Sequence, residues 1–221
     1  MTATTSPQSP SERPGGHSRR DRQAERVERS RRALLDAAAD IINEEGFAAL
    51  THARVGERAG YSRGLVTERF GSKQALIGAL IEETSWAWER RQIGEASDGA
   101  TGLQTIVGFL KGVAEQARQD GRWLRVFYGL LNEALRDPTL ADQAALMHRS
   151  MRRSIASCVE CGIADGSIRA DASPYGVAVG IVAGLRGIGY QWLLDPDVID
   201  AVEAIDNLAA TTELALEVRR P

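Results

Sequence analysis

The chain has few of the residues on which most enzymes and metal proteins depend. It contains two cysteines, Cys158 and Cys161, and three histidines, His17, His52 and His148, among 221 residues. The two cysteines have no second pair with which to complete a zinc site, so we interpret them as packing thiols, with a redox switch as the alternative. No GxGxxG, phosphate-binding loop or nucleophile elbow occurs. The sequence therefore predicts a protein that is not an enzyme and that holds no metal and no cofactor.

Long hydrophobic runs and the alternating pattern of strands are also scarce. The most apolar segment, 177–194, is interrupted by Arg186 and Gln191 and carries four glycines. We expect it to form a buried helix rather than a membrane span. No apolar run near the N-terminus has the form of a signal peptide. The sequence thus predicts a cytoplasmic protein without a membrane partner.

Charge is distributed unevenly along the chain. Residues 13–73 hold 13 Lys+Arg and 9 Asp+Glu, a net charge of +4, whereas the rest of the chain carries −7. A positive end on an acidic body suggests contact with a polyanion. Residues 1–22 are rich in Ser, Pro and Arg and lack a hydrophobic period, which predicts a disordered basic arm. A solvated tail and an arm that follows DNA phosphates both fit this segment.

Apolar residues recur at three- and four-residue steps through most of the chain, and this period is typical of helices. We expect an all-α fold of about nine helices, with an N-terminal three-helix domain at 23–72 and a larger helical bundle at 73–221. Asp-Pro, Asp-Gly and Ser-Pro pairs supply the breaks in the bundle. The fourth helix should run from Lys73 to about Gly94, and the later ones over 102–119, 121–135, 139–164, 174–194 and 197–218.

Residues 51–70 have the spacing of a helix-turn-helix. Thr51 and Ser62 are plausible N-caps of its two helices, and Gly60 tolerates the positive φ that the turn requires. The second helix of such a motif presents polar side chains from its early turns to a DNA major groove. A purely structural corner would not explain exposed cationic residues at these positions. The residues expected on or near the outward side are Ser62, Arg63, Leu65 and Thr67.

The stretch LLDAAADIINEEGFAALTHARVGERAGYSRGLVTERFGSKQAL resembles the N-terminal domain of the tetracycline-repressor (TetR) family of bacterial transcription regulators. The matching features are the LLDAA opening, the Ala-Gly turn followed by Ser62, Gly64, Phe70 and the Ser-Lys entry to the fourth helix. The resemblance implies a homodimer that binds a palindromic operator in double-stranded DNA and responds to a small-molecule effector. We expect a repressor.

The same resemblance implies roles for single residues. Thr51 and Lys73 would bind phosphates on either side of the groove, while Arg63 and Leu65 would meet base edges or neighbouring backbone. The family usually has an aromatic residue where this chain has Thr67, and Glu68 would repel phosphate unless it pairs with Arg69. A helical ligand-binding or protein-interaction domain without sequence-specific DNA binding is therefore the alternative. The predicted DNA-binding set is Thr51, Ser62, Arg63, Leu65, Thr67, Arg69 and Lys73.

Three glycines lie at four-residue steps on one side of the predicted helix 174–194. A glycine inside a helix costs about 1 kcal/mol relative to alanine, so close approach of another helix is the simplest reason for this stripe. Packing within the protomer and a symmetric dimer interface both fit, and the resemblance favours the dimer, formed together with the final helix. The predicted interface residues are Gly176, Gly180, Gly184, Val202, Ile205 and Ala209.

Aromatic residues are spread over the central helices of the body. They fit an ordinary core, and they also fit a cavity for an apolar or planar ligand. The resemblance implies an effector pocket here, for which we select Trp123, Phe127 and Met151 as lining. Effector binding would then move the fourth helix and change the separation of the two DNA-binding domains.

Overall fold

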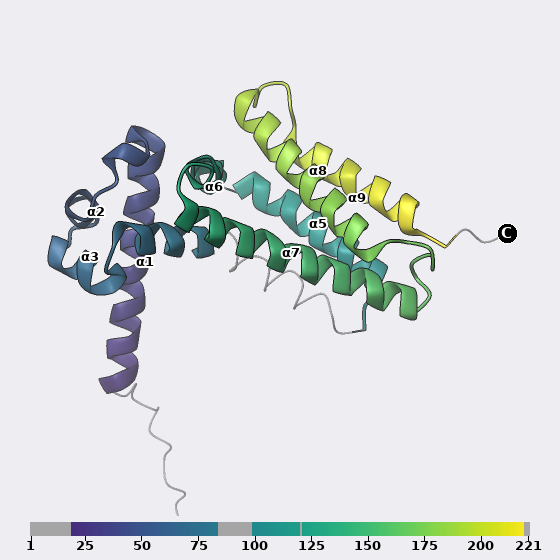
Figure 1. Ribbon diagram of the computed structural model, residues 1–221, viewed down its shortest axis with the longest axis horizontal. Helices are drawn as coiled ribbons and strands as arrows, with labels where there is room; N and C mark the ends of the chain where they lie inside the picture. The colour runs from purple at the N-terminus through teal and green to yellow at the C-terminus, as the bar shows by residue number, and fades with distance from the viewer. Residues whose placement is uncertain (1–18, 84–98, 120, 219–221) are drawn as a thin grey trace, which may run out of the picture.

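The computed structural model describes residues 19–83, 99–119 and 121–218. Within these ranges the regular secondary structure is helical, apart from one isolated antiparallel bridge between Ile168 and Glu217. The predicted all-α fold is confirmed. A small N-terminal helical domain stands at one end of an elongated helical body (Figure 1).

The N-terminal domain comprises α1 (Arg19–Glu45), a short 3-10 helix η1 (Phe47–Ala49), α2 (His52–Ala59) and α3 (Arg63–Phe70). Because α1 begins at Arg19, the last part of the predicted disordered arm, 19–22, is helical, and our prediction was wrong there. Asp21 lies in the first turn of α1, where a negative charge complements the helix dipole. The rest of that arm, residues 1–18, lies outside the described residues.

A fourth helical segment follows at residues 73–83, and the rest of the predicted helix, to about Gly94, lies outside the described residues. Ser72 caps this segment as predicted, since its Oγ accepts from the backbone N–H of Ala75 at 3.1 Å. Leu76 and Leu80 from the segment are fully buried. The helix that links the two domains thus starts at a defined cap.

The body contains α5 (Gly102–Gln119), α6 (Gly121–Ala134), α7 (Pro138–Ala164), α8 (Pro174–Leu194) and α9 (Ala201–Leu216). Four of these agree with the predicted spans to within one residue. The last helix begins later than predicted, because the Asp200 carboxylate accepts from the backbone N–H groups of Val202 and Glu203 at 2.9 and 3.1 Å. A cap at Asp200 fixes the helix start there rather than at 197.

Two hydrophobic clusters organise the core. The first joins α1, α2 and α3 to residues 73–83, and it continues into the body through Val126, Phe127 and Leu130 of α6. The second lies among α5, α7, α8 and α9 around Leu110, Val159 and similar side chains. The first cluster also includes Leu140, Ala144 and Met147 of α7, so the N-terminal domain and residues 73–83 pack onto the body through α6 and α7.

By length and composition one described helix, α8, is able to cross a membrane, with a hydropathy of 1.4 over its most apolar window. Of that window, 28% is buried in the protein. One such helix is weak evidence for a membrane span, and α8 packs on α7 and α9 in the body. Its exposed apolar surface nevertheless requires an explanation.

Candidate DNA-binding surface

The predicted caps and turn of the helix-turn-helix are confirmed. The Thr51 hydroxyl accepts from the Arg54 N–H at 3.3 Å, and the Ser62 hydroxyl accepts from the Leu65 N–H at 3.2 Å. Gly60 has φ 73° and ψ 27°, the left-handed conformation that ends α2. These contacts determine where α2 stops and where α3 starts.

Gly56 is a residue of this motif that the sequence analysis missed. It is buried, and its carbonyl accepts from the Tyr61 N–H at 2.8 Å. A Cβ at this position would lie 2.8 Å from the Tyr61 carbonyl oxygen and 3.0 Å from the Ser62 carbonyl carbon. The turn therefore packs directly on the α2 backbone. The signal in the sequence was a glycine inside a predicted helix, four residues before the turn.

The sides of α3 have distinct surroundings. Val66 is fully buried and Phe70 packs against the core, so this side holds the helix in place. At 100° per residue, Gly64 and Glu68 lie on the opposite side and face away from the protein. Leu65 is half-buried and lines a cavity with α1, so it does not belong to the exposed face expected for it.

Arg63 and Thr67 are exposed on the flank of α3 nearest α2. The Thr67 hydroxyl donates to the Arg63 carbonyl at 3.1 Å and lies 3.1 Å from His52 Nδ1. The Thr67 oxygen is thus fixed by two partners, whereas no hydrogen bond or ion pair joins the Arg63 side chain to another described residue.

Two arginines of α2 are engaged within the domain. Arg58 donates to Glu44 at 2.9 Å, and Arg54 forms an ion pair with Glu45 at the end of α1. The hydrogen bond and charge of Arg58 lower the pKa of Glu44, and Glu44 in turn raises the pKa of Arg58. These pairs hold α2 against α1 and leave Arg63 as the cation directed outward from the motif.

The predicted phosphate-binding positions lie at helix starts. Thr51 is exposed ahead of α2, and Ser72 is exposed ahead of the helical residues 73–83. Lys73 is half-buried, and its ammonium donates to the Phe47 carbonyl at 3.1 Å, which ties this helix start to η1. Glu68 pairs with Arg69 at 3.2 Å, the condition under which its charge is compatible with DNA.

Two of the three predicted effector residues contact the same cation, Arg186. The Arg186 guanidinium lies 4.1 Å from the centre of the Phe127 ring and donates to Met151 Sδ at 3.8 Å. Phe127 and Met151 are both buried, while Trp123 is partly buried against the first cluster. His148 approaches Phe127 edge-on at 6.4 Å. Burial, followed by the charges of Arg186 and Arg152, lowers the pKa of His148 to about 4.

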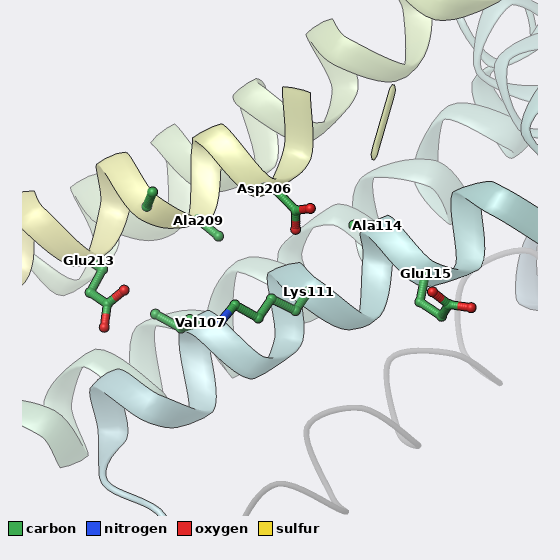
Figure 2. Close-up of a pocket in the computed structure, with 8 residues that line it drawn as sticks. Val107, Lys111, Ala114, Glu115, Asp206, Ala209 and Glu213 are labelled. Atoms are coloured by element: carbon green, nitrogen blue, oxygen red, sulfur yellow. The ribbon is translucent and has the colours of Figure 1, made fainter. Parts of the chain in front are cut away.

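A separate cavity of about 410 Å³ opens between α5 and α9. Figure 2 shows Lys111 of α5 and Asp206 and Glu213 of α9 at this cavity. None of its lining residues is aromatic, and none of the predicted effector residues lines it. Its charged lining differs from the aromatic pocket that the sequence analysis envisaged.

Some of the predicted interface residues are buried within the protomer, and others are exposed. Ile205 and Ala209 are buried inside their own protomer, where side chains of the same chain cover them. Gly184 also packs within the protomer, because its Cβ would lie 3.0 Å from Leu208 of α9. Val202 is half-buried, whereas Gly176 and Gly180 are exposed. The period of apolar residues predicted which faces of α8 and α9 are apolar. It did not predict which other helix, or which second copy, packs against those faces.

The exposed helix α3, held by two caps and a tight turn on a helical body, defines a helix-turn-helix transcriptional regulator. Residues 34–80 match the model for bacterial regulatory proteins of the tetR family. Residues 104–217, just over half of the chain, match the C-terminal domain of BetI-type transcriptional repressors. The chain belongs to the TetR family of transcriptional regulators.

Relatives and solved structures agree with this assignment. The transcriptional regulator TtgR of Pseudomonas putida is 24% identical over 198 residues, which are 86% of this chain and 92% of that protein. The complex of SmeT, a repressor from Stenotrophomonas maltophilia, with triclosan has a TM-score of 0.74, 21% identity and coverage of 86% and 92%. A transcriptional regulator from Saccharomonospora viridis in complex with choline has a TM-score of 0.73, 18% identity and coverage of 87% and 100%. At these identities the solved structures show a shared fold.

Proposed function

We propose that this protein is a cytoplasmic repressor that binds a palindromic operator as a homodimer and responds to a small-molecule effector. The observation that carries the proposal is the exposed start of α3, where Arg63 has no partner among the described residues. An arginine at this position is suited to bidentate contact with a guanine in the major groove. Thr51 and Lys73 would bind the phosphates on the two sides of that groove.

The dimer would form through α8 together with α9. Tyr175, Val179, Tyr190 and Leu194 are exposed on α8, although each is large and apolar or aromatic. Leu214 is likewise exposed on α9. Helices α8 and α9 lie side by side along one edge of the body (Figure 1), and their exposed apolar side chains fit a second copy of the same surface, since symmetric contacts are the commonest route to a dimer. Two α3 helices about 34–36 Å apart would reach successive major-groove turns.

The effector would bind in the helical body. SmeT and the Saccharomonospora viridis regulator each hold a small molecule in a protein of this fold. In this chain the proposed contact region comprises Phe127 and Met151, which contact Arg186, together with Trp123. Lys73 begins the helix that would transmit the change. Because the first hydrophobic cluster joins α6 to α1, a shift of α6 would be felt at the DNA-binding domain.

Selection of bound fragments from the source genome, followed by gel shifts over a range of salt concentrations, tests this proposal. We expect inverted half-sites and an affinity for the selected duplex well above that for random duplex, with both falling steeply as salt increases. A protein that binds no duplex even at low salt would instead be a helical ligand-binding or interaction domain. Fragments with a single, unrepeated half-site would contradict the dimer.

A further inference from the structure

A second cavity, of about 240 Å³, lies between α1 and α3 on the flank of α3 that faces away from α2. Arg26 and Arg29 of α1 line it, together with Arg69 of α3 and Tyr61 of the turn. None of the lining residues carries a carboxylate. The cavity is therefore a concentration of positive charge directly beside the recognition helix.

The three guanidinium groups are incompletely neutralised. No hydrogen bond or ion pair joins the side chain of Arg26 or Arg29 to another described residue. Arg69 donates from Nη1 to Glu68, but its Nε is buried without a hydrogen-bond partner. Like charges gathered in one cavity repel one another, and an anion that enters it removes this repulsion.

The groups at the cavity match a phosphate in geometry as well as in charge. Arginine offers a planar set of N–H donors that pairs with two phosphate oxygens, and Tyr61, 37% exposed, adds a phenol hydroxyl. A helix in the major groove lies between two ridges of phosphates, and a cavity on its flank is where one ridge would pass. We propose that this cavity binds a backbone phosphate of the operator, so that α1 is a second phosphate-binding element. The inference rests on the proposed function.

The position of these arginines is set by helix α1. The helix is continuous from Arg19 to Glu45 and extends past α3 at its N-terminal end (Figure 1). Further along, Arg31 and Arg32 pair with Glu83 at 3.7 and 3.5 Å, which ties α1 to the helical residues 73–83. Arg26 and Arg29 are thus carried by an anchored helix, and less ordering entropy opposes phosphate binding than in a disordered arm.

The test compares the double variant Arg26→Gln, Arg29→Gln with the wild type on selected and random duplexes. The matched control is Arg136→Gln, Arg153→Gln, which removes the same charge from exposed arginines of the body. Each lost phosphate contact reduces the slope of log affinity against log salt by roughly 0.9. With one phosphate in the cavity of each protomer, we expect the dimeric double variant to lose up to about 1.8 and the control to lose none. The loss should be the same on both duplexes, because phosphates carry no sequence.

Ethylation interference provides a second readout. Phosphates whose ethylation blocks the wild type but not the double variant should border the half-site on the α1 side of α3. An unchanged slope, or a loss confined to the selected duplex, would overturn the inference while leaving the proposed function intact. Saturable binding of inorganic phosphate that the variant loses, with an unchanged DNA slope, would make this a free-anion site and would also overturn it. Absence of DNA binding by the wild type would instead refute the proposed function itself.

Discussion

Gly56 and Gly64 flank the turn of the helix-turn-helix and are glycines for different reasons. At Gly56 a Cβ would press on backbone atoms of the turn, 2.8 Å from the Tyr61 oxygen, and backbone cannot move aside as a flexible side chain does. We predict that Gly56→Ala lowers the free energy of unfolding by about 1–3 kcal/mol. Urea denaturation followed by circular dichroism measures this change.

Gly64 is the matched control, because the nearest heavy atom to its Cβ would be Ser62 Oγ at 3.6 Å. Packing therefore leaves room for a side chain, and Gly64→Ala should be neutral or raise stability by up to about 1 kcal/mol through helix propensity. Gly64 faces outward beside Glu68, so the added methyl should weaken operator binding instead. Equal destabilisation by the two substitutions would contradict the packing described for the turn.

The lowered pKa of His148 predicts that the stability of the folded protein depends on pH. Its pKa is lowered to about 4 by burial and by the charges of Arg186 and Arg152, whereas an unperturbed histidine has a pKa of 6.5. Between these values the unfolded chain binds a proton that the folded protein does not, so folding stability falls as pH decreases from about 6.5 to 4. The contribution is fully present above pH 6.5.

His148→Gln removes this titration and should flatten the wild-type decrease in thermal midpoint across that pH window. Thermal unfolding of both proteins at intervals from pH 4 to pH 7.5 makes the comparison. Parallel curves would show that His148 is as free to accept a proton in the folded protein as in the unfolded chain.

At the scale of elements, the crossing of α5 over α7 depends on a glycine. A Cβ on Gly102 would lie 2.2 Å from the Gly162 nitrogen and 2.4 Å from the Cys158 carbonyl oxygen, both backbone atoms. The Gly102 N–H also donates to Asp165 at 2.8 Å, which fixes the start of α5 on the end of α7. We predict that Gly102→Ala costs about 3 kcal/mol or more, since one helix must be displaced from the other.

Gly108 in the same helix provides the comparison for Gly102. No atom lies within 4 Å of its Cβ position, so Gly108→Ala should gain up to about 1 kcal/mol in chemical denaturation. A loss of stability at Gly108 comparable to that at Gly102 would show that the loss at Gly102 does not arise from the crossing of α5 and α7.

The start and end of most helices were predictable because they depend on residues close by in the sequence. Caps such as Thr51, Ser62 and Ser72 act within three residues of their own position, so their signal is contained in the sequence. The neighbours of a helix face are not local. Leu65 was expected to face DNA but is half-buried beside α1, and Ile205 was expected at a dimer interface but is buried in its own protomer. An apolar period predicts that a helix face is buried, but it does not identify the helix or protomer that buries it.

At the scale of the whole molecule, the DNA-binding domain and the body share structure. Arg122 at the start of α6 pairs with Asp40 at 2.7 Å and with Asp36 at 3.2 Å, both on α1. The Asn43 amide donates to the Arg122 carbonyl at 3.3 Å. These contacts cross the domain division proposed from the sequence at residue 72. They connect the body directly to the DNA-binding domain.

The proposed dimer predicts that a charged side chain on the exposed face of α8 will separate the two protomers. Val179 is 41% exposed on the apolar face of α8, and in a symmetric interface Val179→Glu would place two carboxylates against apolar surface. We expect this variant to sediment as a monomer at concentrations where the wild type is a dimer, and to lose most of its operator affinity because one recognition helix reaches one half-site. Leu135→Glu is the control, since Leu135 is 87% exposed at the end of α6, away from α8. Both chains should remain folded, because neither side chain belongs to the buried core. A Val179 variant that stays dimeric would place the second copy on another face, and the spacing of the two α3 helices would have to be derived again from there.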